Sequence, residues 1–422
     1  MTATERVMAI VGAGHVGGRA AQTLREAGWR GRIALIGAEP HLPYERPPLS
    51  KALLTGERSP AQCGLRPVEA WREDSVEHIV ATVQAIDPVA RTLQLGDGAT
   101  LAYEALLLAT GGHARRLTIP GATLAGVLSL RTLDDAAAIG PRLAPGSSIV
   151  VVGGGFIGLE VAASARARGC DVTLIEGGAR LMGRAVPAVI AARAHTLHER
   201  NGVRILLNCA PQAFERLSDG TLDVLLENGD TLRADTVIVG IGIEPADALA
   251  REAGIEVERG IVVDEELATS ARGVYAAGDV ALFPSRFGSH RIRQETWHNA
   301  ETQARVAAHN MLGAHDAYRE LPWFWSDQYD HQLQVAGEPA LGVSSIARAI
   351  GSDAQIHFEL DSGARLVGAS GFGPTSALAK EMKLARMLVE RGASIAPEAL
   401  PRALANPEVK LKSLLRYKKT ET

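Results

Sequence analysis

The chain has 422 residues, which is more than one ordinary domain needs and predicts two or three domains. Its 44 glycines and its 46% hydrophobic content, with only 4% aromatic residues, are typical of an α/β protein with many tight turns. A formal net charge of -4 excludes a general basic surface for nucleic acid. Because the sequence shows no basic-then-apolar leader and no run of about 18 apolar residues, we expect a soluble, cytoplasmic protein without a membrane span.

The first chemical motif lies near the start of the chain. Residues 7–11 are an apolar run typical of a buried strand, and a Gly-x-Gly-x-x-Gly pattern follows them. Helical apolar spacing then runs to Gly28, a second strand is predicted over residues 32–36, and Glu39 lies 22 residues beyond the last glycine. Such glycines let the backbone approach a pyrophosphate, the helix N-terminus supplies free amides, and the acid is placed to bind ribose hydroxyls. The glycines are Gly12, Gly14 and Gly17.

Residues 44–51 read YERPPLSK and place two prolines just before one lysine. Proline fixes φ and removes a backbone donor, so we expect this segment to resist regular structure and to hold one extended shape. One interpretation is an ordinary surface loop. The other is a stiff support that holds the charge of Lys51 in place.

The dinucleotide pattern returns over residues 148–176. Its glycines are followed by a helix and a second strand, and Glu176 ends that strand 18 residues after the last glycine. Each copy is followed by an alternating strand pair, which turns at residues 97–98 or 228–229. We therefore predict an internal repeat and electron transfer between two dinucleotides, unless one copy has become a scaffold. The glycines of the second copy are Gly153, Gly155 and Gly158.

Gly278 and Asp279 stand where a strand over the preceding residues would end. A carboxylate at that place can accept a hydrogen bond from a ribityl hydroxyl, and a following helix can direct amides at a pyrophosphate. An ordinary Gly-Asp turn is the alternative.

Taken together, these motifs resemble the FAD-dependent pyridine-nucleotide oxidoreductases. Within that group the sequence is most similar to the ferredoxin reductases of bacterial oxygenase systems. The resemblance implies an α/β fold with two Rossmann-like domains of the glutathione-reductase type and a smaller α+β C-terminal domain. It implies a discontinuous FAD domain (1–115 and 247–324), an inserted NAD domain (116–246) and a C-terminal domain (325–422). The motifs that carry it are residues 12–17, 46–51, 109–111, 153–158, 277–280, 295–300 and 324–329.

The resemblance also implies the cofactor-binding residues. Those expected to hold FAD are Gly12, Gly14, His15, Gly17, Glu39, Arg46, Lys51, Ala109, Thr110, Gly111, Gly278, Asp279, Glu295, Thr296, Trp297 and Trp325. Those expected to hold NADH are Gly153, Gly155, Phe156, Ile157, Gly158, Glu176, Arg180 and Gly242. No metal site is expected.

Particular roles follow from the same resemblance. Lys51 is expected near N5 of the flavin, where an ammonium favours the anionic reduced form, and Arg46 near the pyrophosphate or ribityl chain. Glu160 is expected near the nicotinamide, with a solvated helix acid as the equal alternative. Trp297 is expected beside the pyrimidine edge and Trp325 over the ring edge, and each could instead be a core aromatic.

Individual side chains indicate which nicotinamide cofactor is preferred and whether acid–base chemistry is needed. A carboxylate at Glu176 repels a 2′-phosphate, which favours NADH over NADPH, although Arg180 nearby could soften that repulsion. His15 and His298 are assigned no acid–base role, because hydride transfer to a flavin needs none.

The cysteines argue against a dithiol relay. Cys63, Cys170 and Cys209 lie far apart, and a lysine follows Ser50 where related disulfide reductases and NADH oxidases or peroxidases carry a redox cysteine. Cys63 is interpreted as a structural or bystander thiol. Electrons should then pass directly from the flavin to a one-electron acceptor.

The acceptor implied by the resemblance is a two-iron (2Fe-2S) ferredoxin. Because such ferredoxins are acidic, we expect docking through Lys410, Lys412 and Arg416, and more weakly through Arg291 and Arg305. A solvated C-terminal tail is the alternative for the last residues.

The predicted function is an NADH-dependent ferredoxin reductase that supplies a monooxygenase or a Rieske dioxygenase. An NADH oxidase or rubredoxin reductase on the same fold is one alternative, and a redox-responsive interaction protein of the apoptosis-inducing-factor kind is another. The sequence gives no prediction of oligomeric state.

Overall fold

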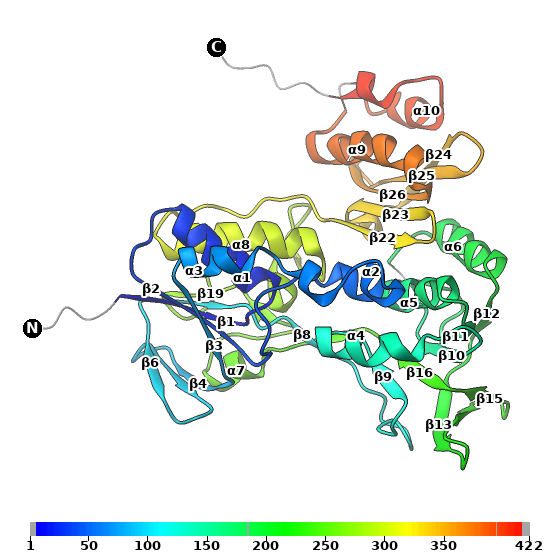
Figure 1. Cartoon of the computed structure of the whole chain (residues 1–422). Helices are drawn as coiled ribbons and strands as arrows, with labels where there is room; N and C mark the ends of the chain where they lie inside the picture. The colour runs from blue at the N-terminus through cyan, green and yellow to red at the C-terminus, as the bar shows by residue number, and fades with distance from the viewer. Residues whose placement is uncertain (1–5, 184, 394, 416–422) are drawn as a thin grey trace, which may run out of the picture. The chain divides into compact units, whose positions relative to one another are not determined.

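The computed structural model describes residues 6–183, 185–393 and 395–415. The described residues form two compact units. Unit 1 lies within Met1–Pro47, Arg58–His113 and Ile243–Glu320, and unit 2 within Pro48–Glu57, Ala114–Gly242 and Leu321–Thr422. Figure 1 labels helices and strands of both units.

Unit 1 is built on a parallel sheet with the strand order β19-β7-β1-β2-β3. The central strand β1 pairs with β2 and β7, so that Ile10 faces Leu35 on one side and Leu107 on the other. These strands are almost wholly buried, which explains why their sequences are continuous apolar runs. Their bounds are β1 (Val7–Val11), β2 (Arg32–Gly37), β3 (Val76–Val80), β7 (Ala105–Leu108) and β19 (Val274–Ala276).

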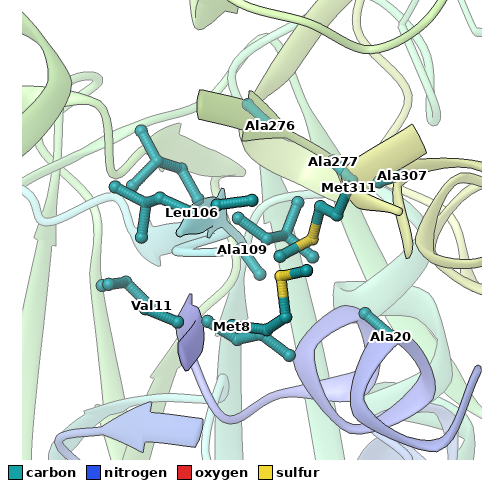
Figure 2. Close-up of a cluster of buried hydrophobic side chains, with 14 of the residues drawn as sticks. Met8, Val11, Ala20, Leu106, Ala109, Ala276, Ala277, Ala307 and Met311 are labelled. Carbon is teal, nitrogen blue, oxygen red and sulfur yellow. The ribbon is translucent and has the colours of Figure 1, made fainter. Parts of the chain in front are cut away.

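Two long helices of unit 1, α1 (His15–Glu26) and α8 (Trp297–Met311), pack side by side (Figure 1). Both helices bury small residues, among them Ala20 on α1 and Ala307 on α8. Small side chains let the two helices approach closely. Figure 2 shows the core beneath them, where Met8 of β1 and Met311 of α8 fill the space between the helices and Leu106. The repeated unit therefore has a core of its own.

Shorter elements complete this part of the chain. An antiparallel sheet of β4 (Val83–Asp87), β5 (Thr92–Leu95) and β6 (Thr100–Ala102) turns at residues 97–98. The others are η2 (Pro60–Cys63), α3 (Val68–Glu73), β8 (Gly112–Ala114), β17 (Ile243–Pro245), α7 (Ala248–Glu252), β18 (Ile261–Val262), η4 (Gly278–Val280), β20 (Ala281–Pro284) and β21 (Arg291–Ile292).

Unit 2 contains the second copy of the parallel sheet, with the order β12-β11-β10-β16-β9. Its strands are β9 (Val127–Ser129), β10 (Ser148–Val152), β11 (Asp171–Glu176), β12 (Val203–Leu207) and β16 (Thr236–Val239). Read from the other end, this order corresponds to that of unit 1. The one difference is the edge strand: β9 precedes the glycine loop of unit 2 in the sequence, whereas β19 follows the glycine loop of unit 1. The other elements are α4 (Leu133–Ile139), η3 (Gly140–Arg142), α5 (Phe156–Ala167), α6 (Ala188–Arg200), β13 (Pro211–Arg216), β14 (Leu222–Leu226) and β15 (Thr231–Ala234).

The last part of unit 2 is an antiparallel sheet with the order β22-β23-β26-β25-β24, and α9 lies against one of its faces (Figure 1). A Cβ at Gly371 in β26 would lie 2.6 Å from Sδ of Met382, so glycine allows this close packing. The elements are β22 (Trp323–Gln328), β23 (His331–Gly337), η5 (Pro339–Leu341), β24 (Ser344–Ile350), β25 (Ala354–Leu360), β26 (Leu366–Pro374), α9 (Thr375–Arg391), α10 (Leu400–Ala405) and η6 (Leu411–Leu414).

The segment that holds Lys51 packs with unit 2. Its short helix α2 (Ala52–Thr55) lies against α5, and the Ser164 hydroxyl donates a hydrogen bond to the Ser50 carbonyl at 2.7 Å. The expectation of an extended proline segment is wrong, because Pro47–Ser50 forms one 3-10 turn, η1. Proline suits the first turn of a helix, where its missing N–H would have no partner.

The predicted α/β class and the repeat of strand, helix and strand are confirmed by the topology. One local prediction needs correction: the helix expected after Asp279 is a single 3-10 turn, Gly278–Val280, which β20 follows at once. The three-domain division stays a prediction. Across residues 6–183, 185–393 and 395–415, no helix is both long enough and apolar enough to cross a membrane.

Candidate functional site

The glycine loop of unit 1 has two packed glycines and one that faces open space. Gly12 has φ +114°, and a Cβ there would lie 2.1 Å from the Ala109 carbonyl oxygen. A Cβ at Gly17 would lie 2.0 Å from the Gly12 carbonyl oxygen, because strand and helix meet there. The atom nearest to a Cβ at Gly14, by contrast, would be Nη2 of Arg46, at a distance of 3.9 Å. The loop thus keeps room for a ligand at its central glycine.

The loop of unit 2 has the same construction. Gly153 has φ +110° and would place a Cβ 2.4 Å from the Gly240 carbonyl oxygen, and Gly158 would place one 2.0 Å from that of Gly153. Nothing lies within 4 Å of a Cβ at Gly155. Both central glycines are N-caps of twelve-residue helices, and in the described structure neither cap is made by a side chain. Free amides beside open space fit the pyrophosphate of a dinucleotide in each loop.

The acid of the first copy is paired with nearby side chains. The Tyr44 hydroxyl donates to Glu39, and Arg46 donates to the other Glu39 oxygen at 3.1 Å. The Arg46 guanidinium also lies over the Tyr44 ring, 5.3 Å from its centre. Arg46 is therefore held beside Gly14, where its charge suits a bound phosphate.

The acid of the second copy is held by its own loop. Glu176 accepts hydrogen bonds from the backbone amides of Gly154 at 2.7 Å and Gly178 at 2.6 Å. Its carboxylate stays at the end of β11, where ribose hydroxyls are expected. Arg180 donates to the Val186 carbonyl at 2.9 Å, so backbone contact fixes its guanidinium.

Other expected FAD residues gather around the first loop in unit 1. A Cβ at Gly278 would lie 2.5 Å from Val16 of α1, so the Gly278–Asp279 turn reaches the start of that helix. The Gly278 amide donates to Gln303 at 2.7 Å, and the Asp279 side chain is half-buried. Ala109 directly follows β7, the strand next to β1, and donates its amide to the Val11 carbonyl at 2.8 Å.

Residues 109–111 continue this edge of unit 1. The Thr110 hydroxyl donates to the Ala246 carbonyl at 2.7 Å, and Gly111 has φ +64°. In unit 2, Gly242 has φ +98° and its carbonyl accepts a hydrogen bond from the Arg115 amide at 3.0 Å.

The start of α8 brings three expected residues together. Thr296 caps the helix by accepting the Asn299 amide at 3.1 Å, and Glu295 pairs with Arg293 at 2.7 Å. Trp297 is half-buried, and its indole N–H donates to Glu45 at 3.2 Å. A half-buried tryptophan with this polar contact agrees poorly with the alternative of a core aromatic.

A buried cluster that the sequence did not predict lies behind Trp297. The His15 ring meets the Trp297 ring edge-on, with centres 5.2 Å apart, and His15 Nε2 lies 2.9 Å from Glu301. Arg19 and Arg305 also donate to Glu301, at 2.7 Å and 2.6 Å. Burial alone would raise the pKa of Glu301, but the hydrogen bonds from His15, Arg19 and Arg305 outweigh it and lower that pKa to about 2.

In unit 2, Lys51 and Glu160 form an ion pair with a distance of 3.1 Å. Ser50 donates to one Glu160 oxygen, and Ser326 donates to the other at 2.7 Å. Glu160 is only 4% exposed, so the alternative of a solvated helix acid is wrong. Lys51 also lies 3.7 Å from Asp327. The sequence named Lys51 and Glu160 but gave no sign that they pair or that Ser50 and Ser326 complete the site.

Two aromatic pairs lie on α5 and β22, the elements that also carry Glu160 and Ser326. Phe156, at the start of α5, meets Phe324 edge-on with ring centres 4.9 Å apart, and Ile157 next to it is 46% exposed. Trp325 is half-buried, stacks on Trp323 at 5.1 Å and donates its indole N–H to Asp327 at 3.1 Å. Trp325 is therefore no core residue.

The three cysteines are buried, whereas the described residues expected at the docking surface are exposed. Cys63, Cys170 and Cys209 are free and buried, and burial raises the pKa of each thiol, which favours structural roles. Lys410 and Lys412 are exposed on either side of the buried Leu411, so these two belong to folded structure. Arg416 lies outside the described residues. Arg291 is exposed, and the Arg305 side chain is 57% exposed.

The sequence profile described as "Pyridine nucleotide-disulphide oxidoreductase" matches residues 6–304. The chain belongs to this family. A second profile, "Reductase C-terminal", matches residues 323–415, the region of the antiparallel sheet and α9. Both parts of the chain therefore have counterparts in the family.

Curated relatives of this family align over most of the chain. The chain is 41% identical to "Anthranilate 1,2-dioxygenase system ferredoxin--NAD(+) reductase component" of Burkholderia cepacia, over 96% of the chain and 98% of the relative. It is 40% identical to "Rhodocoxin reductase" of Rhodococcus erythropolis, over 80% of each chain.

Solved structures of the family have the same fold. The ferredoxin reductase for the CYP199A2 system from Rhodopseudomonas palustris has a TM-score of 0.90 at 36% identity, over 96% of this chain and 98% of that one. The covalent putidaredoxin reductase–putidaredoxin complex has a TM-score of 0.89 at 33% identity, over 97% of this chain and 98% of that one. The resemblance inferred from the sequence is confirmed.

Proposed function

We propose that this protein is an NADH-dependent ferredoxin reductase that holds FAD in unit 1 and binds NADH in unit 2. The observation that carries this proposal is the pair of glycine loops, each with packed outer glycines and open space at Gly14 or Gly155. Two intact loops support two bound dinucleotides and argue against one copy being a scaffold. The relatives named as ferredoxin reductases support the same reaction class.

The residues around each loop suit these ligands. FAD would lie over Gly14 with Arg46 at its pyrophosphate, Glu39 at its ribose and Asp279 at the ribityl chain. NADH would lie over Gly155 with Glu176 at its ribose. The Glu176 carboxylate, held by two amides of its own loop, would repel a 2′-phosphate and so favours NADH over NADPH. When bound, FAD accepts a hydride and returns its two electrons one at a time.

The Lys51–Glu160 pair is the proposed catalytic element of the chain. Glu160 fixes the Lys51 ammonium in one position at 3.1 Å, and the two serines satisfy the remaining carboxylate lone pairs. A preorganised ammonium stabilises negative charge better than one that must be ordered during the reaction. The positions of Lys51 and Trp325 beside the flavin stay predictions.

The proposed acceptor is a two-iron ferredoxin. The exposed Lys410 and Lys412 would meet its acidic surface, and Arg291 and Arg305 are further candidates. In the absence of a redox cysteine next to Ser50, no dithiol stands between the flavin and this acceptor. Transfer directly from the flavin suits a one-electron partner.

The test is NADH consumption by FAD-loaded protein, in air alone and with a two-iron ferredoxin coupled to cytochrome c. We expect slow turnover in air and an increase of at least about a hundredfold with ferredoxin. Rapid oxygen consumption that ferredoxin leaves unchanged would contradict the proposal and would indicate an NADH oxidase. Slow turnover under both conditions, with a long-lived complex between the reduced protein and NAD, would indicate an interaction protein.

A further inference from the structure

A line of buried polar side chains in unit 2 runs from the Lys51–Glu160 pair to a tyrosine in a hairpin turn. Ser326 and Gln328 lie on the same face of β22, and both are fully buried. His198, in the last turn of α6, is also fully buried. Tyr329 follows Gln328 directly and is half-buried.

Each of these side chains contacts the next. Ser326 lies 2.7 Å from Glu160, and Gln328 lies 3.4 Å from Ser326. His198 Nε2 lies 3.2 Å from Oε1 of Gln328, and His198 Nδ1 lies 3.3 Å from the Tyr329 hydroxyl. The rings of His198 and Tyr329 also meet edge-on, with centres 5.1 Å apart. The contacts form one continuous path.

The chemistry of the groups gives this path a single direction. A carboxylate only accepts, so the one hydroxyl proton of Ser326 must go to Glu160. Ser326 can then only accept from Gln328, which places the amide N–H₂ toward the serine and the amide oxygen toward His198. That oxygen needs a donor, so His198 must carry its proton on Nε2. Nδ1 is then an acceptor, and Tyr329 must donate to it.

The surroundings of His198 favour this arrangement. Burial lowers the pKa of His198 to about 4, with smaller effects from Gln328 and from His195 on the same helix. Burial also raises the pKa of Tyr329, although Arg166 nearby opposes the shift. At neutral pH the imidazole is therefore uncharged and the phenol keeps its proton.

The backbone at Tyr329 is consistent with a requirement for that side chain. Tyr329 and Asp330 form the two-residue turn between β22 and β23, and Tyr329 has φ +57°. This left-handed conformation favours glycine or asparagine, and a tyrosine there is strained. The turn thus keeps an unfavourable residue whose hydroxyl ends the path.

We propose that His198, in its Nε2–H tautomer between Tyr329 and Gln328, is a positioning residue that directs a line of donors onto Glu160 and so fixes the Lys51–Glu160 pair. His198 touches neither Lys51 nor Glu160. It acts through Gln328 and Ser326, which set the direction of the last hydrogen bond. The effect of this pair on the reaction rests on the proposed function, but the tautomer does not.

The first experiment is nitrogen NMR of the FAD-loaded protein with isotope-labelled histidine. The signal of His198 is identified as the one that disappears in His198→Gln. We expect this signal to show a proton on Nε2 and none on Nδ1. His195→Gln is the matched control, because His195 lies on the same helix and pairs with Glu199 at 3.2 Å outside the path. A proton on Nδ1, or a doubly protonated ring at neutral pH, would overturn the proposal whether or not the protein reduces ferredoxin.

The second experiment measures flavin reduction by NADH in a stopped-flow instrument at matched FAD content. Tyr329→Phe keeps the ring but removes the donor, and His198→Leu removes the acceptor and the donor together. We expect the limiting rate to fall about fivefold in both, with little change in the apparent Kd for NADH. His198→Gln should recover most of the rate, since an amide N–H can replace Nε2–H. Wild-type rates in both Tyr329→Phe and His198→Leu would overturn the proposal.

Discussion

The two units have glycine loops of the same construction but opposite charges at one equivalent position. Two residues after the last glycine, unit 1 has Arg19 and unit 2 has Glu160. Each belongs to an ion pair with little exposure: Arg19 lies 2.7 Å from Glu301, and Glu160 lies 3.1 Å from Lys51. Both residues lie beyond the first turn of their helices, so each charge is held mainly by its partner in the ion pair rather than by the helix dipole.

This difference shows that the glycine motif determines the shape of the loop but not the charges around it. The glycines determine where a dinucleotide can approach, and they are built alike in both units. The charges around them come from distant segments, and they differ because the two ligands have different tasks. In our account unit 1 only holds its dinucleotide, whereas unit 2 must also place an ammonium for the reaction. The following variants test that division.

The largest contrast is expected between two glycines of one loop. Gly158→Ala would force a Cβ to 2.0 Å from the Gly153 carbonyl oxygen, whereas Gly155→Ala meets nothing within 4 Å. We expect Gly158→Ala to lose more than about 3 kcal/mol of unfolding free energy. Gly155→Ala should unfold like the wild type but bind NADH at least about tenfold more weakly. Thermal unfolding and NADH titration measure the two effects, and equal loss of stability in both variants would contradict the account.

The next effect is a pH-dependent stability in unit 1. Because the pKa of Glu301 is lowered from 4.5 to about 2, its stabilisation is complete above pH 4.5 and is lost as the pH falls toward 2. We expect Glu301→Gln to cost about 2 kcal/mol at pH 7, and the difference from the wild type to shrink below pH 4.5. Chemical denaturation across this range measures it. A difference that stays constant with pH would show that Glu301 is not the stabilising charge.

Removing the cation from each ion pair should separate a reaction role from a structural one. We expect Lys51→Met to slow flavin reduction by NADH about thirtyfold, which is about 2 kcal/mol of barrier. Arg19→Met, the matched variant of unit 1, should destabilise the fold and leave the rate per bound FAD within about threefold. Stopped-flow absorbance gives both rates. A similar slowing in the two variants would remove the distinction between the units.

Glu176 and Glu39, the acids of the two dinucleotide motifs, should also differ in which nucleotide they affect. Glu176 orders two amides of its own loop, so Glu176→Gln keeps one acceptor but loses the charge. We expect the Kd for NADH to rise about tenfold and the difference in affinity between NADH and NADPH to become smaller. Titration with both nucleotides measures it, with Glu39→Gln as the control that should change FAD retention instead.

The smallest effect is expected at the docking residues. Lys410→Gln with Lys412→Gln should raise the KM for ferredoxin about threefold and weaken its dependence on salt, because both lysines are exposed. Turnover with ferricyanide, a small acceptor, is the control and should not change. A KM unaffected at low salt would place the docking surface elsewhere.

Local patterns in the sequence predicted much of this architecture. The apolar run before Gly12, the helical spacing after Gly17 and the turns at residues 97–98 and 228–229 depend on near neighbours, and the structure has them as expected. The proline segment was misjudged because the same φ suits both an extended chain and the first turn of a helix.

Contacts between distant residues could not be predicted in this way. Lys51 and Glu160 are 109 positions apart, and Ser326 lies a further 166 positions from Glu160. The sequence named Lys51 and Glu160 from family resemblance, but it left open whether Glu160 was buried. The Glu301 cluster and the path through His198 carry no motif, because each depends on which side chains the fold brings together.

The most direct test of the central claim is a single anaerobic turnover. FAD-loaded protein is reduced with one equivalent of NADH and then mixed with an excess of oxidised two-iron ferredoxin, while flavin and ferredoxin absorbance are followed together. We expect the flavin to be reoxidised as about two ferredoxins per flavin are reduced. A flavin that stays reduced in the presence of ferredoxin, and is reoxidised only when oxygen is admitted, would contradict it.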